Sequence, residues 1–357
     1  MAEELGAIYG SSLWLHDLDR ITEYLPELSE LDGKSVLITG ANGLICSAVA
    51  DVLLRYNETH SGNIRIIAAG RNPQRVRTRF GEYCDKDYFT FMQYDALSPE
   101  LPEFIADYII HGAGNAHPAA MAGQPVDTML GNIVGTNTLL DYVIHGVVSV
   151  KRLLYISSSE VYGRRTDGNS QPFTEDDYGS VDILNSRSCY PMGKRSAETL
   201  CVSYAEQYDV DDVIVRPGHI YGPTASVNDS RVSSAFAYNA ARGENIVIKS
   251  AGLQVRSWCY CLDCASAVLK VLLRGKAVNA YNIPGEILTI REMSEKLAEF
   301  GGVELVCEKA SESERKAFNP MDNSSLDGSK LEALGWRNIF DADTGLKHTV
   351  EILRHMI

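Results

Sequence analysis

Short apolar runs alternate with helix-like segments over much of this chain. Each run is nearly continuous in apolar residues, as in strands that are buried on both faces of a parallel sheet. Between the runs, apolar residues recur at helical spacing. The predicted strands are Val36–Thr39, Ile64–Ala69, Tyr108–Ile110, Leu153–Ser157 and Val213–Val215. This alternation predicts an α/β fold with a doubly wound parallel sheet.

The pattern changes toward both ends of the chain. Residues 11–30 have helical periodicity and predict a helix that packs on the core or contacts a second copy. After Arg216 the sequence becomes irregular, and the apolar spacing then predicts helices at Val268–Arg274, Ile290–Phe300 and Leu331–Trp336. These later segments predict a smaller C-terminal lobe.

Composition narrows the class of protein. The 357 residues are 45% hydrophobic, enough for a substantial core. A formal net charge of −14 argues against a nucleic-acid partner, since nucleic-acid phosphates attract basic surfaces. No run approaches about 18 apolar residues, and the first residues lack the features of a signal peptide. We therefore expect a soluble, cytoplasmic protein with no membrane partner.

The eight cysteines are scattered, which favours free thiols in a reducing compartment. Cys259, Cys261 and Cys264 lie close in sequence. The alternating pattern predicts a strand there, with Cys259 and Cys261 on one face, and no fourth ligand follows at zinc-site spacing. We expect no metal site.

A glycine-rich turn follows the first predicted strand. The segment Val36-Leu-Ile-Thr-Gly-Ala-Asn-Gly-Leu-Ile-Cys46 gives a strand, a turn and a helix start in that order. Glycines there let the backbone approach a pyrophosphate at the helix N-terminus, so the turn predicts a Rossmann-type dinucleotide site. Cys46 replaces the third glycine of the usual pattern, which serves helix packing. The predicted cofactor contacts at this turn are Gly40, Asn42, Gly43, Leu44 and Ile45.

The end of the second predicted strand bears on the choice of cofactor. NAD sites normally place an acid there to bind the adenosine ribose. This chain has Ala68-Ala-Gly-Arg-Asn72 instead, with no acid and with Arg71 placed for a 2′-phosphate. These residues favour NADP, whereas NAD stays open if Arg71 is only a solvated turn residue.

Two further segments are predicted to lie at the cofactor. The segment His111-Gly-Ala-Gly114 follows a strand and offers bare backbone, which makes His111, Gly112 and Ala113 candidate contacts. Asn132 is expected to anchor a helix behind the site. The predicted division is an N-terminal helical extension at 1–32, a dinucleotide-binding domain at 33–215 and 250–278, and a substrate-binding lobe at 216–249 and 279–345.

Tyr190 and Lys194 are four residues apart, so on a helix they share one face. An ammonium group close to a phenol stabilises the phenolate, which predicts that Tyr190 acts as a base near neutral pH. Such a pair is common by chance, but here it accompanies a cofactor turn. Together they predict an enzyme.

These motifs resemble the extended short-chain dehydrogenase/reductases, the NAD-dependent epimerase/dehydratase family that acts on nucleotide sugars. The resemblance to the family covers residues 33–340, and within the family the chain is most similar to the UDP-glucuronate decarboxylase branch. The segments that carry the resemblance are Thr39-Gly-Ala-Asn-Gly-Leu-Ile, His111-Gly-Ala, Gly131-Asn-Ile-Val-Gly-Thr, Ser157-Ser-Ser-Glu-Val-Tyr-Gly, Tyr190-x-x-x-Lys194, Arg216-Pro-Gly-His-Ile-Tyr-Gly-Pro and Leu334-Gly-Trp.

The resemblance implies roles for individual residues. Tyr190 would be the base, Lys194 would bind the nicotinamide ribose and lower the pKa of Tyr190, and Ser158 would orient the sugar hydroxyl while hydride leaves sugar C4. The implied substrate is a nucleotide-diphosphate sugar. The resemblance implies that Arg231 and Arg256 bind its nucleotide diphosphate. The other candidate substrate contacts are His117, Arg187, His219 and Lys249, and for His117 an ordinary hydrogen-bonded loop position stays open. The resemblance also implies a homodimer that uses the helix bearing Tyr190.

Glu160 bears on the fate of the resulting 4-keto sugar. The family's 4,6-dehydratases place an Asp-Glu pair where this chain has Ser159-Glu160, so dehydration lacks its proton donor. A hexuronate oxidised at C4 is a β-keto acid, which loses CO₂ readily, and the branch's decarboxylases share the glutamate. The leading prediction is a UDP-hexuronate decarboxylase-like enzyme with four catalytic residues, Tyr190, Lys194, Ser158 and Glu160.

Two departures from the branch leave alternatives open. The segment Asn319-Pro-Met-Asp-Asn-Ser-Ser325 replaces an Arg-Lys-Pro segment whose Arg assists catalysis, and His219 replaces an Asn. A nucleotide-sugar 4-epimerase would not need that Arg. An NADPH-consuming 4-ketosugar reductase is favoured by Arg71 alone, and a dinucleotide-binding sensor or scaffold is the non-enzyme alternative.

Overall fold

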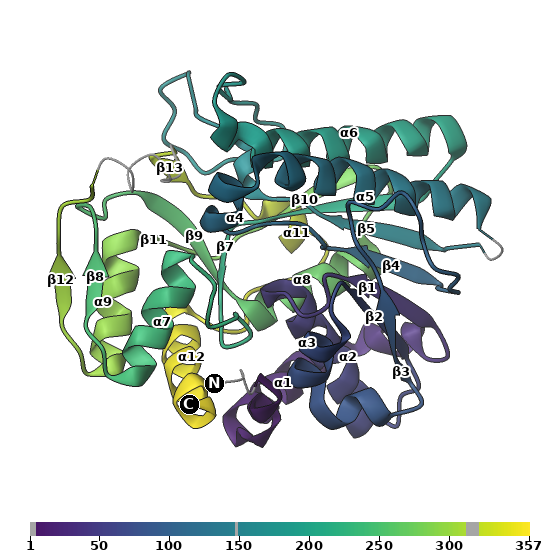
Figure 1. Cartoon of the computed structure of the whole chain (residues 1–357), viewed down its shortest axis with the longest axis horizontal. Helices are drawn as coiled ribbons and strands as arrows, with labels where there is room; N and C mark the ends of the chain where they lie inside the picture. Colours follow the sequence, from purple (N-terminus) through teal and green to yellow (C-terminus); the bar gives the residue numbers. More distant parts are fainter. Residues whose placement is uncertain (1–4, 147–148, 312–320) are drawn as a thin grey trace.

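The larger lobe of the molecule is built around a seven-stranded parallel sheet (Figure 1). The computed structural model describes residues 5–146, 149–311 and 321–357. The strand order is β10-β6-β5-β4-β1-β2-β3. The strands are β1 (Ser35–Thr39), β2 (Arg65–Gly70), β3 (Phe89–Gln93), β4 (Tyr108–His111), β5 (Arg152–Ile156), β6 (Asp212–Pro217) and β10 (Asn279–Ile283). The predicted doubly wound sheet is confirmed, with each of the five predicted strands within two residues of its expected ends.

The two strands at the sheet edges, β3 and β10, lie outside the predictions because their sequences mix polar and apolar residues. β10 pairs with β6, although the predicted boundaries assign it to the substrate-binding lobe. Conversely β9 (Val255–Tyr260), assigned to the dinucleotide-binding domain, belongs to a smaller sheet. The domain division otherwise stays a prediction.

Helices cover both faces of the large sheet. Val36 and Ile38 of β1 pack on the side of α2 (Leu44–Thr59), α3 (Pro73–Phe80) and α8 (Cys261–Arg274). Leu37 packs on the opposite side, with α5 (Pro125–His145) and α6 (Cys189–Tyr208). This alternation follows from the period of two along a strand. Short helices complete this part: η3 (Gly81–Asp85), α4 (Pro118–Gly123), η4 (Ser159–Tyr162) and η5 (Ser186–Ser188).

The smaller lobe is built around β9, which pairs with three strands. These are β7 (His219–Tyr221), β11 (Glu286–Thr289) and β13 (Asn323–Ser324), while β8 (Ile246–Ile248) pairs with β12 (Leu305–Cys307). The helices are α7 (Val232–Arg242), α9 (Ile290–Gly301), α11 (Ser329–Glu332) and α12 (Ala342–Met356). The predicted helix at Leu331–Trp336 is wrong in its second half, because α11 ends at Glu332 and Trp336 instead donates its indole N–H to Ser266.

The N-terminal helical segment packs on both lobes. It consists of η1 (Leu5–Gly10), α1 (Ser12–Tyr24) and η2 (Pro26–Leu31), divided where Pro26 removes a backbone donor. On α1, Asp19 forms an ion pair with Arg55 of α2 at 2.7 Å. Asp17, fully buried, lies 2.9 Å from Nδ1 of His348 on α12. The predicted packing helix is therefore present between α2 and α12 (Figure 1).

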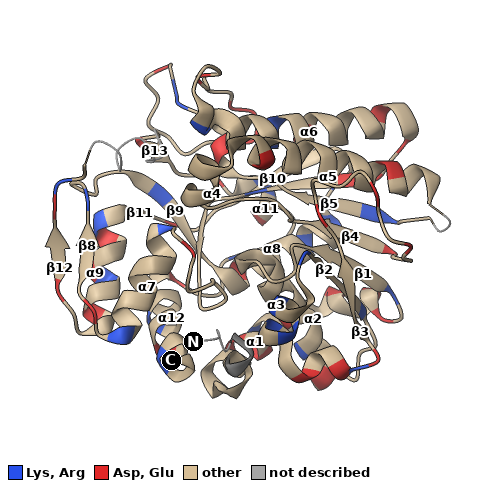
Figure 2. Ribbon diagram, in the orientation of Figure 1, with Lys and Arg blue, Asp and Glu red and all other residues tan. Residues whose placement is uncertain are grey.

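Charged side chains of both signs are spread over the two lobes (Figure 2). Within the described ranges, the structure contains no helix that is both long and apolar enough to cross a membrane.

Candidate active site

The glycine-rich turn connects β1 to α2 and leaves open backbone. Gly40 has φ +69°, and a Cβ atom there would lie 3.0 Å from backbone atoms of Ala113. Gly43 is the N-cap of α2, and no side chain of the described residues caps this helix. Its first N–H groups therefore remain available to an anion. Asn42 is half-buried in the turn, and Leu44 and Ile45 open the helix.

Cys46 and Gly112 share one small space between α2 and the end of β4. A Cβ atom on Gly112 would come within 2.3 Å of the Cys46 sulfur. The Cys46 sulfur therefore lies where a side chain on Gly112 would be. Gly112 permits the close packing that the third glycine usually permits. Burial raises the pKa of the Cys46 thiol to about 12, so this thiol is a neutral packing group.

His111 is a buried support for this backbone. Its Nδ1 lies 2.7 Å from the Thr39 hydroxyl, and the same hydroxyl accepts the Ala113 N–H at 3.2 Å. Burial, together with the charge of Lys194, lowers the pKa of His111 to about 3. The ring is therefore neutral. It contacts the Thr39 hydroxyl, which in turn holds the Ala113 backbone beside the glycine-rich turn.

Asn132 ties together three elements, as expected for an anchor behind the site. Its side chain donates to the Thr128 carbonyl at 2.8 Å and accepts the hydroxyl of Tyr155 at 3.1 Å. A Cβ atom on Gly114 would lie 3.4 Å from its Oδ1 atom. These glycines, the open N-terminus of α2 and the supported backbone fit a dinucleotide.

Tyr190 lies on α6 and is 7% exposed. Burial and the neighbouring Glu160 carboxylate raise its pKa to about 12, whereas a hydrogen bond with Ser158 and the charges of Arg231 and Arg187 act to lower it. The Nζ atom of Lys194 lies 5.8 Å from the centre of the Tyr190 ring, so the predicted effect of this ammonium group on Tyr190 stays a prediction.

Lys194 is buried beneath Tyr190 on α6. Its Nζ donates to the Ile156 carbonyl at 2.7 Å and lies 4.7 Å from the centre of the Tyr155 ring. Burial lowers its pKa to about 8. With one N–H engaged by Ile156, two donors remain for a ligand.

Glu160 and Arg187 form an ion pair beside Tyr190. Arg187 donates to the Glu160 carboxylate at 2.9 Å, and the two side chains are only 13% and 16% exposed. Ser158 accepts the Glu160 backbone N–H at 3.2 Å as the N-cap of η4. One turn of chain therefore orients both Ser158 and Glu160 toward α6.

Cations and a histidine from the smaller lobe complete the cluster. Arg231 is bound to Asp229 through a bidentate ion pair. Arg256 is 2% exposed and donates to the carbonyls of Val255 and Met321, and its electrostatic neighbours include Glu160. Burial and both of these arginines lower the pKa of His219 to about 3.

The Nδ1 atom of His219 is buried and has no hydrogen-bond partner in the described parts of the chain. The ring lies 5.3 Å from the Trp258 ring. His219 is therefore a neutral group with an unmet hydrogen-bonding atom inside the cluster.

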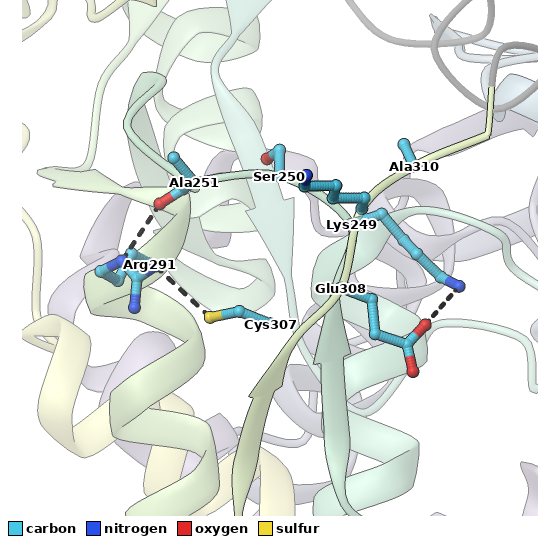
Figure 3. Close-up of a pocket in the computed structure, with 8 residues that line it drawn as sticks. Lys249, Ser250, Ala251, Arg291, Cys307, Glu308 and Ala310 are labelled. Atoms are coloured by element: carbon cyan, nitrogen blue, oxygen red, sulfur yellow. Dashed lines mark hydrogen bonds and ion pairs between the residues drawn. The ribbon is translucent and has the colours of Figure 1, made fainter.

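His117 and Lys249 lie differently from the other predicted substrate contacts. His117 is the N-cap of α4, and its Nδ1 accepts the Ala120 N–H at 3.4 Å. Lys249 forms an ion pair with Glu308 at 2.8 Å and lines a separate hollow of about 570 Å³ with Arg291 and Cys307 (Figure 3). None of Ser158, Glu160, Tyr190 and Lys194 lines this hollow.

The cysteine cluster differs from its prediction in one respect. Cys261 begins α8 instead of continuing the strand, so it does not alternate with Cys259. Over the described residues, no three His, Cys, Asp or Glu side chains are arranged to hold a metal ion.

Two residues of the site lie outside the sequence predictions. Asp229 is the partner of Arg231, and the spacing Asp229-x-Arg231 was the signal available for it. Tyr155 lies under Lys194, and only the fold brings β5 and α6 together. Residues 319–320 of the segment that replaces Arg-Lys-Pro lie outside the described residues.

Comparisons with known proteins agree with this geometry. The sequence model of the NAD dependent epimerase/dehydratase family matches residues 36–284. UDP-glucuronic acid decarboxylase 6 of Arabidopsis thaliana is 33% identical over 74% of this chain and 73% of the relative. Low-salt glycan biosynthesis protein Agl12 of Haloferax volcanii is 30% identical over 88% of this chain and 97% of the relative.

A solved structure shares the fold. The UDP-glucuronic acid 4-epimerase of Bacillus cereus, in complex with UDP-glucuronic acid and NAD, has a TM-score of 0.73 and 21% identity, over 90% of this chain and 100% of that one.

Proposed function

This chain belongs to the NAD-dependent epimerase/dehydratase family, and we propose that it oxidises C4 of a UDP-linked hexuronate and releases C6 as CO₂. The observation that carries the proposal is the environment of Tyr190. Glu160 lies beside it in an ion pair with Arg187, and Ser159 stands where a dehydratase would have its acid. The 33% identical relative bears the name of a UDP-glucuronic acid decarboxylase.

In the first step Tyr190 removes the proton of the C4 hydroxyl, which Ser158 orients through its hydrogen bond with the phenol. An oxidised nicotinamide held by these residues would supply the hydride acceptor for C4, and its positive charge would favour the phenolate. Lys194 would hold the nicotinamide ribose with its two remaining N–H donors.

The carboxyl group then leaves. The C5–C6 bond breaks, its electron pair moves into the C4 carbonyl as an enolate, and C6 departs as CO₂. A proton adds to C5, and Tyr190 returns its proton to the C4 oxygen, for which the reduced cofactor would supply the hydride at C4. The cycle consumes one proton and no net reductant.

The cations of the smaller lobe bind the diphosphate of the substrate in this proposal. Arg231 and Arg256 are charged groups in a protein of net charge −14, so they supply the local positive field that a diphosphate requires. His219 offers its unmet ring nitrogen to the same ligand.

A 4-epimerase is the second candidate. It is favoured by residues 321–325, Met-Asp-Asn-Ser-Ser, which carry no basic side chain to assist decarboxylation. Incubation with UDP-glucuronate and mass analysis of the product decides: a loss of CO₂ supports the decarboxylase, an unchanged mass with a new epimer supports the epimerase, and an unaltered substrate contradicts both. Steady consumption of NADPH at 340 nm would instead indicate the reductase.

We also propose a homodimer formed through α5 and α6, which pack side by side (Figure 1). Val126 and Leu130 on α5 and Val202 and Tyr208 on α6 are each at least 40% exposed, as in an apolar face that a second copy covers. Light scattering of the wild type and of a Leu130→Asp variant tests this: a wild-type monomer would contradict it. A cytoplasmic location stays a prediction for cell fractionation.

A further inference from the structure

The turn after β2 carries an unusual charge for the ribose end of a dinucleotide site. Residues 70–75 read Gly-Arg-Asn-Pro-Gln-Arg and contain no acid. Arg71 and Arg75 are both exposed, and neither guanidinium has a hydrogen-bond or ion-pair partner among the described residues. A carboxylate that would accept both ribose hydroxyls of NAD is missing from this turn, and two cations are present.

We propose that Arg71, assisted by Arg75, binds the 2′-phosphate of NADP, so that this chain binds NADP more tightly than NAD. A guanidinium matches a phosphate group with two parallel hydrogen bonds. The inference concerns the adenosine end of the cofactor alone and does not rest on the proposed sugar reaction.

Backbone geometry places this turn next to the pyrophosphate turn. A Cβ atom on Gly70 would lie 3.7 Å from Oδ1 of Asn42, within the glycine-rich turn. The Gln93 side chain of β3 donates to the Arg71 carbonyl at 3.0 Å and thereby fixes the backbone of Arg71. The guanidinium is therefore attached to an ordered turn at the edge of the cofactor site.

The N-terminus of α3 is not the anion site. Asn72 caps this helix, and its Oδ1 accepts the N–H groups of Gln74 and Arg75 at 2.9 and 3.2 Å. Since these donors are occupied, a phosphate at this turn depends on the side chains of Arg71 and Arg75. Figure 2 shows the basic colouring at α3 within an acidic protein.

Calorimetric titration of the full chain with NADP⁺ and NAD⁺ tests the proposal, and the nucleotide released on acid denaturation is identified by mass. We expect NADP⁺ to bind at least about tenfold tighter than NAD⁺. Arg71→Ala is expected to weaken NADP⁺ about 10- to 100-fold and to leave NAD⁺ within about twofold. Arg75→Ala is expected to act in the same direction and less.

Arg77→Ala is the matched control, because Arg77 lies on α3 like Arg75 but is paired with Asp85 at 2.6 Å. It removes one positive charge from the neighbourhood of the turn without changing Arg71 or Arg75. Equal affinity for the two cofactors, tighter NAD⁺ binding, equal losses for both cofactors in Arg71→Ala, or a loss in Arg77→Ala as large as in Arg71→Ala would each overturn the proposal. No sugar is present, so these outcomes are independent of the proposed decarboxylation.

Discussion

Arg187 holds Glu160 in an ion pair of 2.9 Å at the side of Tyr190, although 27 residues separate the two in sequence. The two charges act on Tyr190 in opposite directions: Glu160 raises the pKa of the phenol and Arg187 lowers it. Burial is the larger cause of the raised pKa of Tyr190, and the pair adjusts how readily the phenol becomes a base.

Arg187→Ala should move the pH dependence of hydride transfer to higher pH. The variant loses a cation that lowers the pKa of Tyr190 and leaves Glu160 without its partner. We expect the first-turnover rate at pH 7 to fall about tenfold and to recover partly at higher pH. Stopped-flow absorbance at 340 nm with UDP-glucuronate measures it.

Glu160→Gln should move the pH dependence of hydride transfer in the opposite direction. It removes the charge that raises the pKa of Tyr190, so the same pH profile should move to lower pH. Arg164→Ala, an exposed arginine nearby in sequence, is the control. Shifts of the same sign in the first two variants would contradict this account.

Tyr190→Phe should lower turnover by about 10²- to 10⁴-fold, because the phenylalanine ring fills the same space but cannot accept the hydroxyl proton. Dinucleotide binding should be unchanged within about twofold. Product formation and calorimetry measure the two effects. Tyr178→Phe, at a tyrosine that is 88% exposed, should retain full activity; full activity in Tyr190→Phe would support the scaffold alternative.

Lys194→Met should abolish activity and stabilise the fold near neutral pH. Burial lowers the pKa of Lys194 from an ordinary 10.5 to about 8 in the folded protein. Keeping this amine charged therefore lowers the free energy of unfolding by roughly 3 kcal/mol. The hydrogen bond to Ile156 offsets about 1 kcal/mol of that loss. The penalty is fully present below about pH 8 and is lost as the pH rises toward about 10.5, where the unfolded chain also releases the proton.

Thermal unfolding of this variant at pH 7 and pH 9.5 measures that window. We expect Tm to rise by a few degrees at pH 7 and by less at pH 9.5. The exposed Lys347→Met should change neither value. An equal rise at both pH values would show that the charge of Lys194 is not the cause.

Gly112→Ala should destabilise the protein by about 1–3 kcal/mol, because the new methyl group would collide with the Cys46 sulfur. Adding Cys46→Ala to that variant should restore most of the loss. Urea unfolding of the two single variants and the double variant measures the coupling. Additive effects would show that the two residues do not share the space.

Local sequence patterns were sufficient for the turn after β1 and for the pair on α6. Gly40 and Gly43 are adjacent to their strand and helix, and Tyr190 and Lys194 lie one helical turn apart, so spacing alone determines their relation. The edge strand β10 reads Asn-Ala-Tyr-Asn-Ile and carries no such apolar run.

Relations between distant segments could not be predicted in this way. Lys194 acts next to Tyr155 and Cys46, and the charges that lower the pKa of Tyr190 come from Arg231 and Arg187. Burial also reverses the direction expected for the pKa of Tyr190. A nearby cation alone would lower this pKa, but the surroundings exclude water and the pKa is raised. Such effects depend on which elements the fold brings together.

The N-terminal helix α1 connects the two lobes through ion pairs and lies outside the segment that the family model matches. The family match begins at residue 36, yet α1 supplies the carboxylates that meet Arg55 on one lobe and His348 on the other. A fragment starting at β1 would leave Arg55 and His348 without these partners and expose the buried surface under Trp14. We therefore expect a fragment without α1 to be less stable than the whole chain.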